Sequence, residues 1–352
     1  MCSRETKELA KNADSLILFS LSRFLSFLSS PSENTHILCD MKTLLLILAL
    51  AMSHEDSLRV MFWNLENFFD WRNDSTSVSD AEFSSQGARH WTRKRFQTKC
   101  NTIAKSILWV AENEGALPDV IGLAEVENAR ALHYLIQNTA LEKLDYKAVH
   151  FDSPDRRGID VALLYRSTRL RLKEASPCHL YSDSTIMQTR DILLAVFFTG
   201  SGDSLAVLVN HHPSKYGGAA LSEYRREVAV NRLKSLSDSL LETGHKRIVA
   251  IGDFNDTPDN PLYETLDSIL VNLSLPLQRS RLGTIRYNGE WELIDLCFVS
   301  RPISGASTLK ILYIPFLMVP DRTHGGMKLL RTYSGPKYLG GVSDHCPIML
   351  TI

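Results

Sequence analysis

The stretch IVAIGDFNDTP, residues 248–258, decides the fold of this chain. Its first four residues are apolar and predict a buried strand, and Gly252 marks the point where polar residues begin. Asp253 and Asn255 then follow the strand. Polar groups placed directly after apolar strands are where α/β proteins build their sites. The stretch therefore predicts an α/β chain with a functional site at one end of its strands.

The same arrangement recurs at five other places along the chain. Each place has an apolar strand with polar residues at or next to its end: Asn64 and Glu66 after Leu58–Trp63, Glu125 after Val120–Ala124, His211 and His212 after Ala206–Asn210, Asp295 inside Leu293–Val299, and Asp344 and His345 before Ile348–Ile352. Each signal alone is weak, because an Asp in a Gly-Asp-x-Asn stretch is often a turn former. Six such signals in one chain indicate one shared site.

The rest of the pattern is typical of a single α/β domain. Apolar residues at helical spacing predict helices over 91–113, 129–139 and 222–241, and a further strand covers 161–165. Strands 192–198 and 206–210 form a predicted hairpin around the turn 199–203. The polar stretch 70–90 predicts a loop. This mixture predicts two packed sheets between helices.

Composition limits the classes of function. The 352 residues are 44% hydrophobic and 22% charged, with a formal net charge of -1, so the chain is globular but has no basic excess. Contact with a polyanion would therefore rest on a local patch. The start of the first long helix offers one, which could grip a phosphate backbone or form a solvated helix face: Arg89, Arg93, Lys94, Arg95 and Lys99, with Trp91 among them.

The N-terminal region has the layout of a targeting segment. Met41 and Lys42 precede an apolar run, Thr43 to Leu50, and residues 49–51 give a small-x-small cleavage site, which is typical of a secretory signal peptide. The run is shorter than the ~20 residues that span a bilayer. Residues 1–40 would then be an upstream extension or a disordered tail. We expect a secreted or periplasmic protein, or a cytoplasmic one if residues 41–51 are not a signal.

Four cysteines follow that region, and none forms a C-x-x-C pair. Their wide spacing makes a zinc site improbable. One or two disulfides and buried free thiols both remain open for these four: Cys100, Cys178, Cys297 and Cys346.

The polar residues at the strand ends suit metal-assisted phosphoester chemistry. Mg²⁺ binds one or two carboxylates and keeps several waters. Glu125, Glu66 and Asp344 could supply these carboxylates. Asp253 can orient or deprotonate a water, and Asn255 can donate to a phosphate oxygen. His345 can act as a general acid or base, and Asp295 would fix its tautomer.

Seven ordered motifs resemble the endonuclease/exonuclease/phosphatase superfamily. They span about residues 58 to 352: FWNLENFFD (62–70), GLAEVEN (122–128), GIDVALLYR (158–166), VNHHPSKYGG (209–218), GDFNDTP (252–258), LIDLCFVS (293–300) and GGVSDHCPI (340–348). The resemblance implies a four-layer α/β/β/α sandwich of two mainly antiparallel or mixed sheets, with helices outside and the site at one end. It also implies a Mg²⁺ (or Mn²⁺, or Ca²⁺) phosphoesterase.

The resemblance also implies residue roles. Asn64 and Asn255 would contact the phosphate, and Glu66 and Glu125 would serve the metal. His211 or His212 would lie at the scissile phosphate, and Asp295 would pair with His345 beside Asp344. Adjacent strand residues point to opposite faces, so only one histidine of the pair should face the site, and the spacing to Ser214 and Lys215 favours His211. Asp160 could orient the active histidine or cap its own loop.

Three functions remain open at this point. A secreted, monomeric endonuclease acting on nucleic acid is the first, supported by the NLENFFD and NHHPSK stretches. A phosphatase or phosphodiesterase acting on phospholipid or small phosphoesters fits the near-zero charge better. A non-catalytic binding module is the third, which the intact polar set disfavours. No stable protein partner is indicated. The sequence does not distinguish endo from exo cleavage, or one metal ion from two.

Overall fold

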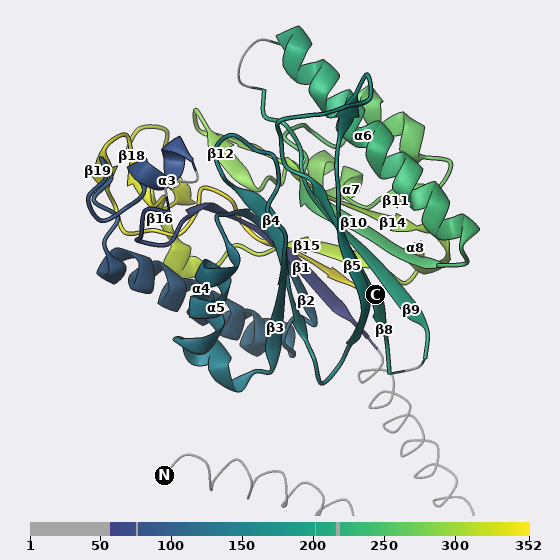
Figure 1. Cartoon of the computed structure of the whole chain (residues 1–352), viewed down its shortest axis with the longest axis horizontal. Coiled ribbons are helices and arrows are strands. Elements are labelled where there is room, and N and C mark those ends of the chain that lie inside the picture. Colours follow the sequence, from purple (N-terminus) through teal and green to yellow (C-terminus); the bar gives the residue numbers. More distant parts are fainter. Residues whose placement is uncertain (1–56, 75–76, 201, 216–218) are drawn as a thin grey trace, which may run out of the picture. The chain divides into compact units, whose positions relative to one another are not determined.

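The chain is described by a computed structural model in which residues 57–74, 77–200, 202–215 and 219–352 are placed. Two six-stranded sheets form its frame, ordered β15-β20-β1-β2-β4-β3 and β11-β14-β10-β9-β8-β5. Each contains one parallel pair, β1 with β2 and β9 with β10, while its other pairs are antiparallel. Helices cover the outer faces, with α4 and α5 against the first sheet and α6 against the second (Figure 1). The expected four-layer sandwich of mixed sheets is confirmed.

The first sheet is built from β1 (Arg59–Phe68), β2 (Val120–Val126), β3 (Tyr146–His150), β4 (Asp160–Arg166), β15 (Thr308–Ile311) and β20 (Ile348–Thr351). The second is built from β5 (Arg171–Cys178), β8 (Ile192–Phe198), β9 (Ser204–His211), β10 (Arg247–Asp253), β11 (Leu270–Asn272) and β14 (Asp295–Ser300). The described residues also contain four separate two-stranded hairpins: β6 (Tyr181–Ser182) with β7 (Thr185–Ile186), β12 (Ile285–Tyr287) with β13 (Glu290–Glu292), β16 (Met318–Pro320) with β17 (Met327–Leu329), and β18 (Tyr333–Ser334) with β19 (Lys337–Tyr338).

The long helices are α4 (Arg93–Glu114), α5 (Ala129–Gln137) and α6 (Ala219–Glu242). Thr92 begins α4, Asn128 begins α5 by accepting from the Ala131 backbone N–H at 2.9 Å, and Gly115 ends α4 in the left-handed conformation. Shorter helices are α3 (Val78–Glu82), α7 (Leu275–Arg279), α8 (Arg301–Ser304), and the 3-10 turns η1 (Ala140–Lys143), η2 (Pro261–Leu266) and η3 (Pro315–Leu317). None of the helices in the described residues is long and apolar enough to span a membrane.

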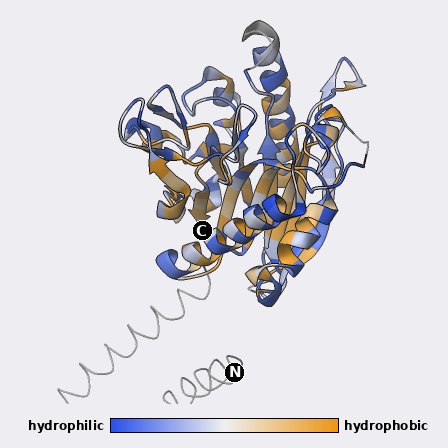
Figure 2. Ribbon diagram, turned by 90° about the vertical axis from the view of Figure 1, so that its left-hand side faces the viewer, coloured by the Kyte–Doolittle hydropathy of each residue, from blue (hydrophilic) through white to orange (hydrophobic). Residues whose placement is uncertain are grey.

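Strand alternation assigns each apolar side chain to a layer. In β1, Val60 and Phe62 belong to the core between the sheets, whereas Met61 and Trp63 pack in the core shared with α4 and α5. This is the period of two that an extended chain imposes. Apolar residues accordingly gather in the strands and on the inward faces of the helices (Figure 2).

Two sequence expectations need correction, and one open alternative is decided. The stretch 70–90 contains the short helix α3, whose first turn is capped by the Ser77 hydroxyl accepting from the Asp80 N–H. The strand expected to end at Trp63 continues to Phe68, because backbone pairing with β2 persists beyond the apolar run. Disulfides are excluded for the four cysteines after residue 57, which are buried free thiols: Cys100, Cys178, Cys297 and Cys346. The predicted signal at 41–51 lies outside the described residues.

Candidate active site

Three neighbouring strands of the second sheet place a row of polar side chains at one end of the inter-sheet core. Asp253 on β10 lies opposite His211 on β9 and opposite Asp295 on β14. Residues two positions earlier or later on these strands, such as Val209, Ile251 and Cys297, face the other sheet. The same alternation therefore turns all three polar side chains inward.

The fourth member of this row comes from the loop before β20. His345 Nδ1 lies 2.8 Å from Asp295 Oδ2, and its Nε2 lies 3.8 Å from Asp253 Oδ2. His211 Nε2 lies 3.7 Å from the same Asp253 oxygen. Asp253 thus lies between two imidazole rings, and all four residues are buried. This is the His–carboxylate pairing that the sequence predicts for Asp295 and His345.

Asn64 joins the row from the facing sheet. Its Nδ2 donates to Asp253 Oδ2 at 3.0 Å, so a contact crosses the space between the sheets. Its Oδ1 accepts from the Glu66 backbone N–H at 2.9 Å, and the Ser343 hydroxyl donates to its carbonyl at 2.6 Å. Both polar atoms of the Asn64 amide are therefore held, and residues from five separate parts of the sequence converge.

Burial sets the protonation of these groups. Burial, reinforced by the charge of Asp295, raises the pKa of Asp253 to about 7. Burial alone would lower the pKa of His345, but the charges of Asp295, Asp253 and Asp344 outweigh it and hold that pKa well above its ordinary value. Burial, helped by Arg190 and Arg157, lowers the pKa of His211 well below its ordinary value. Near neutral pH, His345 is therefore protonated, His211 is neutral, and Asp253 can accept a proton.

The two adjacent histidines face different layers. His211 points into the row, as the alternation on β9 requires. His212 packs on Phe254 with ring centroids 4.5 Å apart, and its Nε2 lies 3.3 Å from Asn210 Oδ1. Burial lowers the pKa of His212 to about 3. The geometry thus brings His211 to the candidate site and leaves His212 in the packing behind it.

Asn255 supports the loop after β10. It has a left-handed backbone with φ 52°, its N–H donates to Asp253 Oδ1 at 2.9 Å, and its Nδ2 donates to the His212 carbonyl at 3.0 Å. The sequence predicts that Asn255 contacts phosphate. In this structure its amide ties the Asp253 loop to the residue that follows β9.

A second cluster contains the three expected metal ligands. Glu66 Oε1 lies 2.8 Å from Arg331 Nη2, and Asp344 Oδ2 lies 3.0 Å from the same nitrogen. Glu125 Oε2 accepts from the Asn67 N–H at 2.7 Å and lies 3.4 Å from Arg157 Nη2. This cluster adjoins the histidine row, because Asp344 Oδ1 lies 3.9 Å from His345 Nε2.

The carboxylate cluster fits a divalent cation. Burial, reinforced by the charge of the neighbouring Asp344, raises the pKa of Glu66 to about 7, so its contacts with Arg331 and Lys99 do not fully offset the cost of burying its charge. All candidate donor atoms are carboxylate oxygens, which are the preferred ligands of Mg²⁺, Mn²⁺ and Ca²⁺. A separate group, Asp253, Asp295 and His345, has ligand atoms that all lie within 4.8 Å of one another.

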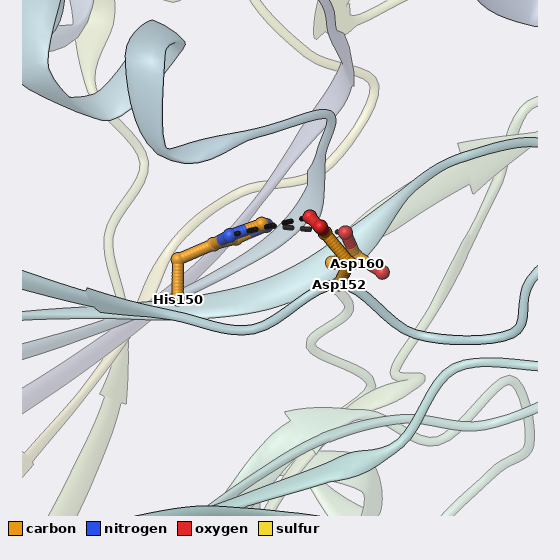
Figure 3. A group of neighbouring side chains, drawn as sticks. All are labelled: His150, Asp152 and Asp160. Carbon is orange, nitrogen blue, oxygen red and sulfur yellow. Dashed lines mark hydrogen bonds and ion pairs between the residues drawn. The ribbon is translucent and has the colours of Figure 1, made fainter. Parts of the chain in front are cut away.

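Among the described residues, Asp160 contacts neither His211 nor His345. Its Oδ2 lies 3.1 Å from His150 Nε2, and its Oδ1 accepts from the Ser153 N–H at 2.9 Å. Asp152 Oδ1 lies 3.8 Å from His150 Nδ1 (Figure 3). The reason is again alternation, since the residues two and four further along β4 face α4 and α5 rather than the second sheet. The hypothesis that Asp160 orients His211 or His345 is therefore wrong, and its bond to Ser153 supports the loop role.

The basic start of α4 is largely committed to internal contacts. Arg89 pairs with Glu82 at 2.6 Å, and the Arg95 guanidinium lies over Tyr338. Lys99 is only 2% exposed and donates to the Glu66 carbonyl at 2.6 Å. Burial lowers the pKa of Lys99 to about 8. Lys99 therefore supports the carboxylate cluster through the backbone of Glu66. Of the two alternatives for the basic helix start, an exposed binding surface for a phosphate backbone is wrong for these three side chains.

Two residues of the site had no signal in the sequence reasoning. Arg331 comes from a stretch without a regular pattern, between β17 and β18, and reaches Glu66 across the fold. Arg157 precedes the GIDVALLYR motif by one residue, but only the fold shows that it meets Asn67 and Glu125. A single arginine in an irregular loop gives no periodicity from which its partner could be inferred.

Comparison with known proteins decides the family. A sequence model described as the Endonuclease/Exonuclease/phosphatase family matches residues 59–352, which is nearly all of the described chain. The chain belongs to the endonuclease/exonuclease/phosphatase family. Membership in this family indicates a hydrolase that acts on phosphoester bonds. Among curated proteins, a sequence comparison found no match.

Solved structures of this family share the fold. A Bacteroides thetaiotaomicron mannosyl-6-phosphatase has a TM-score of 0.54 at 15% identity, covering 84% of this chain and 99% of its own. The human Nocturnin catalytic domain with bound sulfate has 0.51 at 19% identity, covering 84% and 92%. D. rerio TDP2 complexed with a single strand DNA product has 0.51 at 14% identity, covering 84% and 98%. These similarities show the fold and do not indicate which substrate this chain acts on.

Proposed function

We propose that this member of the endonuclease/exonuclease/phosphatase family is a divalent-metal-dependent phosphodiesterase that cleaves nucleic acid. The observation that carries the proposal is the placement of Asp253. This buried carboxyl lies between His211 and the His345–Asp295 pair and accepts a hydrogen bond from Asn64. Its pKa of about 7 suits proton transfer at neutral pH.

Each side chain has a role in hydrolysis. Asp253 Oδ2 accepts a proton from the water that attacks phosphorus, while Asn64 holds that oxygen in place. The protonated His345, kept charged by Asp295, faces the same space through Nε2 and can give a proton to the departing oxygen. Neutral His211 can donate a hydrogen bond to a phosphate oxygen as negative charge accumulates there.

The carboxylates of Glu66, Glu125 and Asp344 would hold the cation. Mg²⁺ is the ion we propose, with Mn²⁺ or Ca²⁺ as alternatives, because all the donors are oxygens. When bound, the cation polarises a phosphoryl oxygen and stabilises the leaving oxygen. Arg331 and Lys99 limit repulsion among these carboxylates, and Arg157 lies 3.4 Å from Glu125.

The place of action is also a proposal. The basic start, apolar run and small-x-small end of residues 41–51 support export, and we propose that the protein acts outside the cytoplasm as a monomer.

A phosphatase acting on small phosphoesters is the second candidate. The formal net charge of -1 supports it, since proteins that bind long polyanions usually carry a basic excess. The internal contacts of Arg89, Arg95 and Lys99 also weaken the basic patch that would have favoured nucleic acid.

A substrate panel separates the two candidates. Purified protein with Mg²⁺ or Mn²⁺ should nick plasmid DNA, and EDTA should abolish the nicking. Release of inorganic phosphate from a monoester without nicking would favour the phosphatase. In either case His345→Ala should lower turnover at least ~10²-fold, as loss of acid–base catalysis typically does. Hydrolysis that is unaffected by EDTA would contradict the proposal.

A further inference from the structure

A cavity of about 490 Å³ lies next to the candidate active site, and Arg190 belongs to its lining. It is bounded by the start of α6, the strand-connecting segment 187–190 and the loop before β4. Six residues carry its chemistry: Asp155, Arg156, Thr189, Arg190, Tyr224 and Arg225.

The cavity is positively charged. Arg190 pairs with Asp155 at 3.1 Å, and the other oxygen of Asp155 accepts from the Arg157 backbone N–H at 2.9 Å. Both oxygens of the Asp155 carboxylate therefore have a partner within the protein. Arg156 and Arg225 line the same cavity, are exposed, and make no hydrogen bond or ion pair with any other described residue. Two guanidinium charges thus remain without a counterion.

Two lining residues also have unmet hydrogen-bonding capacity. Thr189 is 6% exposed and Arg190 is 8% exposed, yet Thr189 Oγ1 and Arg190 Nε have no partner in the structure. Buried polar groups are nearly always paired, so each such group calls for an explanation. The Tyr224 hydroxyl lies 2.8 Å from Ser182 Oγ and fixes one wall of the cavity.

The backbone ties this cavity to the reaction centre. Pro213 and Ser214, which line it, follow His211 and His212 directly. Arg190 Nη2 donates to the His212 carbonyl at 2.8 Å. On the opposite wall Arg156 is followed by Arg157, which lies 3.4 Å from Glu125. An anion in the cavity would therefore lie beside the scissile group without occupying its place.

We propose that this cavity binds a second phosphate group of the substrate, one that is not cleaved. Guanidinium groups match phosphate oxygens in geometry and charge, and a threonine hydroxyl adds a neutral donor. The inference rests on the proposed phosphoesterase function and narrows it to substrates that carry two phosphate groups. These can be successive phosphates of a nucleic-acid strand or two phosphates on one small molecule.

Phosphate binding can be measured without turnover. Wild-type protein in EDTA is titrated with inorganic phosphate by calorimetry, beside the double variant Arg156→Ala/Arg225→Ala. We expect the double variant to bind at least about tenfold more weakly, as loss of charge-assisted hydrogen bonds does. A matched control, Arg281→Ala/Arg322→Ala, removes the same charge elsewhere and should bind as wild type does. Equal weakening in both double variants, or in neither, would overturn the proposal.

Turnover then identifies the source of the phosphate. Three kinds of probe are compared with Mg²⁺: bis(p-nitrophenyl) phosphate, a thymidine dinucleotide against a trinucleotide, and a hexose monophosphate against its bisphosphate. In either the nucleotide pair or the hexose pair, wild type should hydrolyse the member with two phosphates faster than the member with one. The double variant should lose this preference, while its rate on the one-phosphate member stays within twofold of the wild-type rate. The pair in which this preference is found shows whether the second phosphate belongs to a nucleic-acid strand or to a small molecule.

The outcomes separate this inference from the proposed function. A preference retained by the double variant would refute the second-phosphate site while leaving phosphoester hydrolysis intact. If wild type hydrolyses none of the probes, the proposed function fails, and a specific phosphate affinity in calorimetry would then show an anion site unrelated to it.

Discussion

Replacing Asp295 with asparagine tests the centre of the reasoning. The carboxylate lies 2.8 Å from His345 Nδ1, and both side chains are buried, with Asp295 1% and His345 7% exposed. An amide of nearly equal size keeps the shape of the contact but removes its charge. The substitution therefore isolates the electrostatic part of the pair.

The expected magnitude follows from the geometry. At 2.8 Å, two unit charges interact by ~6 kcal/mol at an effective dielectric constant of about 20, which is an upper value and corresponds to ~10⁴ in rate. Asp253 and Asp344 remain 3.8 and 3.9 Å from His345 Nε2 and keep part of this stabilisation. We therefore expect Asp295→Asn to lower kcat by ~10³-fold.

The assay is hydrolysis of bis(p-nitrophenyl) phosphate with saturating Mg²⁺. The set contains Asp295→Asn, His345→Ala and the double variant, because residues that act as one unit give strongly non-additive losses. We expect the double variant to be no slower than His345→Ala. Asp238→Asn, which removes a partly exposed carboxylate on α6, should stay within twofold of wild type.

Two results would refute the reasoning. The first is a folded Asp295→Asn protein, judged by an unchanged thermal unfolding transition, with activity within fivefold of wild type. The second is a double variant whose loss equals the product of the single losses, which would show that Asp295 and His345 act independently.

The remaining predictions concern the two adjacent histidines and one glycine. His211→Ala should lower turnover at least ~10²-fold, whereas His212→Phe should stay within fivefold, measured with the same chromogenic substrate. Folding lowers the pKa of His212 from 6.5 to about 3, so its contribution to stability is full above pH 6.5 and is lost as the pH falls toward 3. Between pH 6.5 and pH 4.5, wild type should therefore lose about 2 kcal/mol more unfolding free energy than His212→Phe does, measured by urea titration. Parallel pH dependences of the two proteins would contradict this. A Cβ at Gly252 would lie 2.1 Å from the Asn210 carbonyl oxygen, so Gly252→Ala should lower stability by about 2 kcal/mol or more, whereas Gly305→Ala, with open space around it, should change stability by less than about 0.5 kcal/mol.

The sequence predicted which way the polar side chains of the row point, because alternation is a local property. Once 206–210 and 248–251 are taken as buried strands, a period of two turns His211 and Asp253 to the same side as the apolar core residues. Their direct opposition depends on the parallel register of β9 and β10, which no local pattern contains. The resemblance to a known family supplied that missing step, since it implied one site from separate motifs.

The supporting contacts could not be predicted in the same way. Asp160 follows the same alternation as its strand, but which layer that face meets depends on the stacking of the two sheets. Lys99 belongs to a run of basic residues that looks like a solvated helix face, and only the packing of α4 shows that its amine lies under Glu66. Arg331 reaches the same carboxylate from 265 residues away.

The backbone around the carboxylates shows how the site is held ready before any substrate binds. Glu66, Asn67, Glu125 and Asn255 all have positive φ, a conformation that costs most residues roughly 1–2 kcal/mol. Three of these residues use the resulting turn to direct a backbone N–H at a site side chain, toward Asn64, Glu125 and Asp253 respectively. An apolar pattern cannot reveal such turns, because the strand pairing continues around them. The strain and the hydrogen bonds occur together because each acceptor is buried or charged, and the fold satisfies it with its own backbone rather than with water.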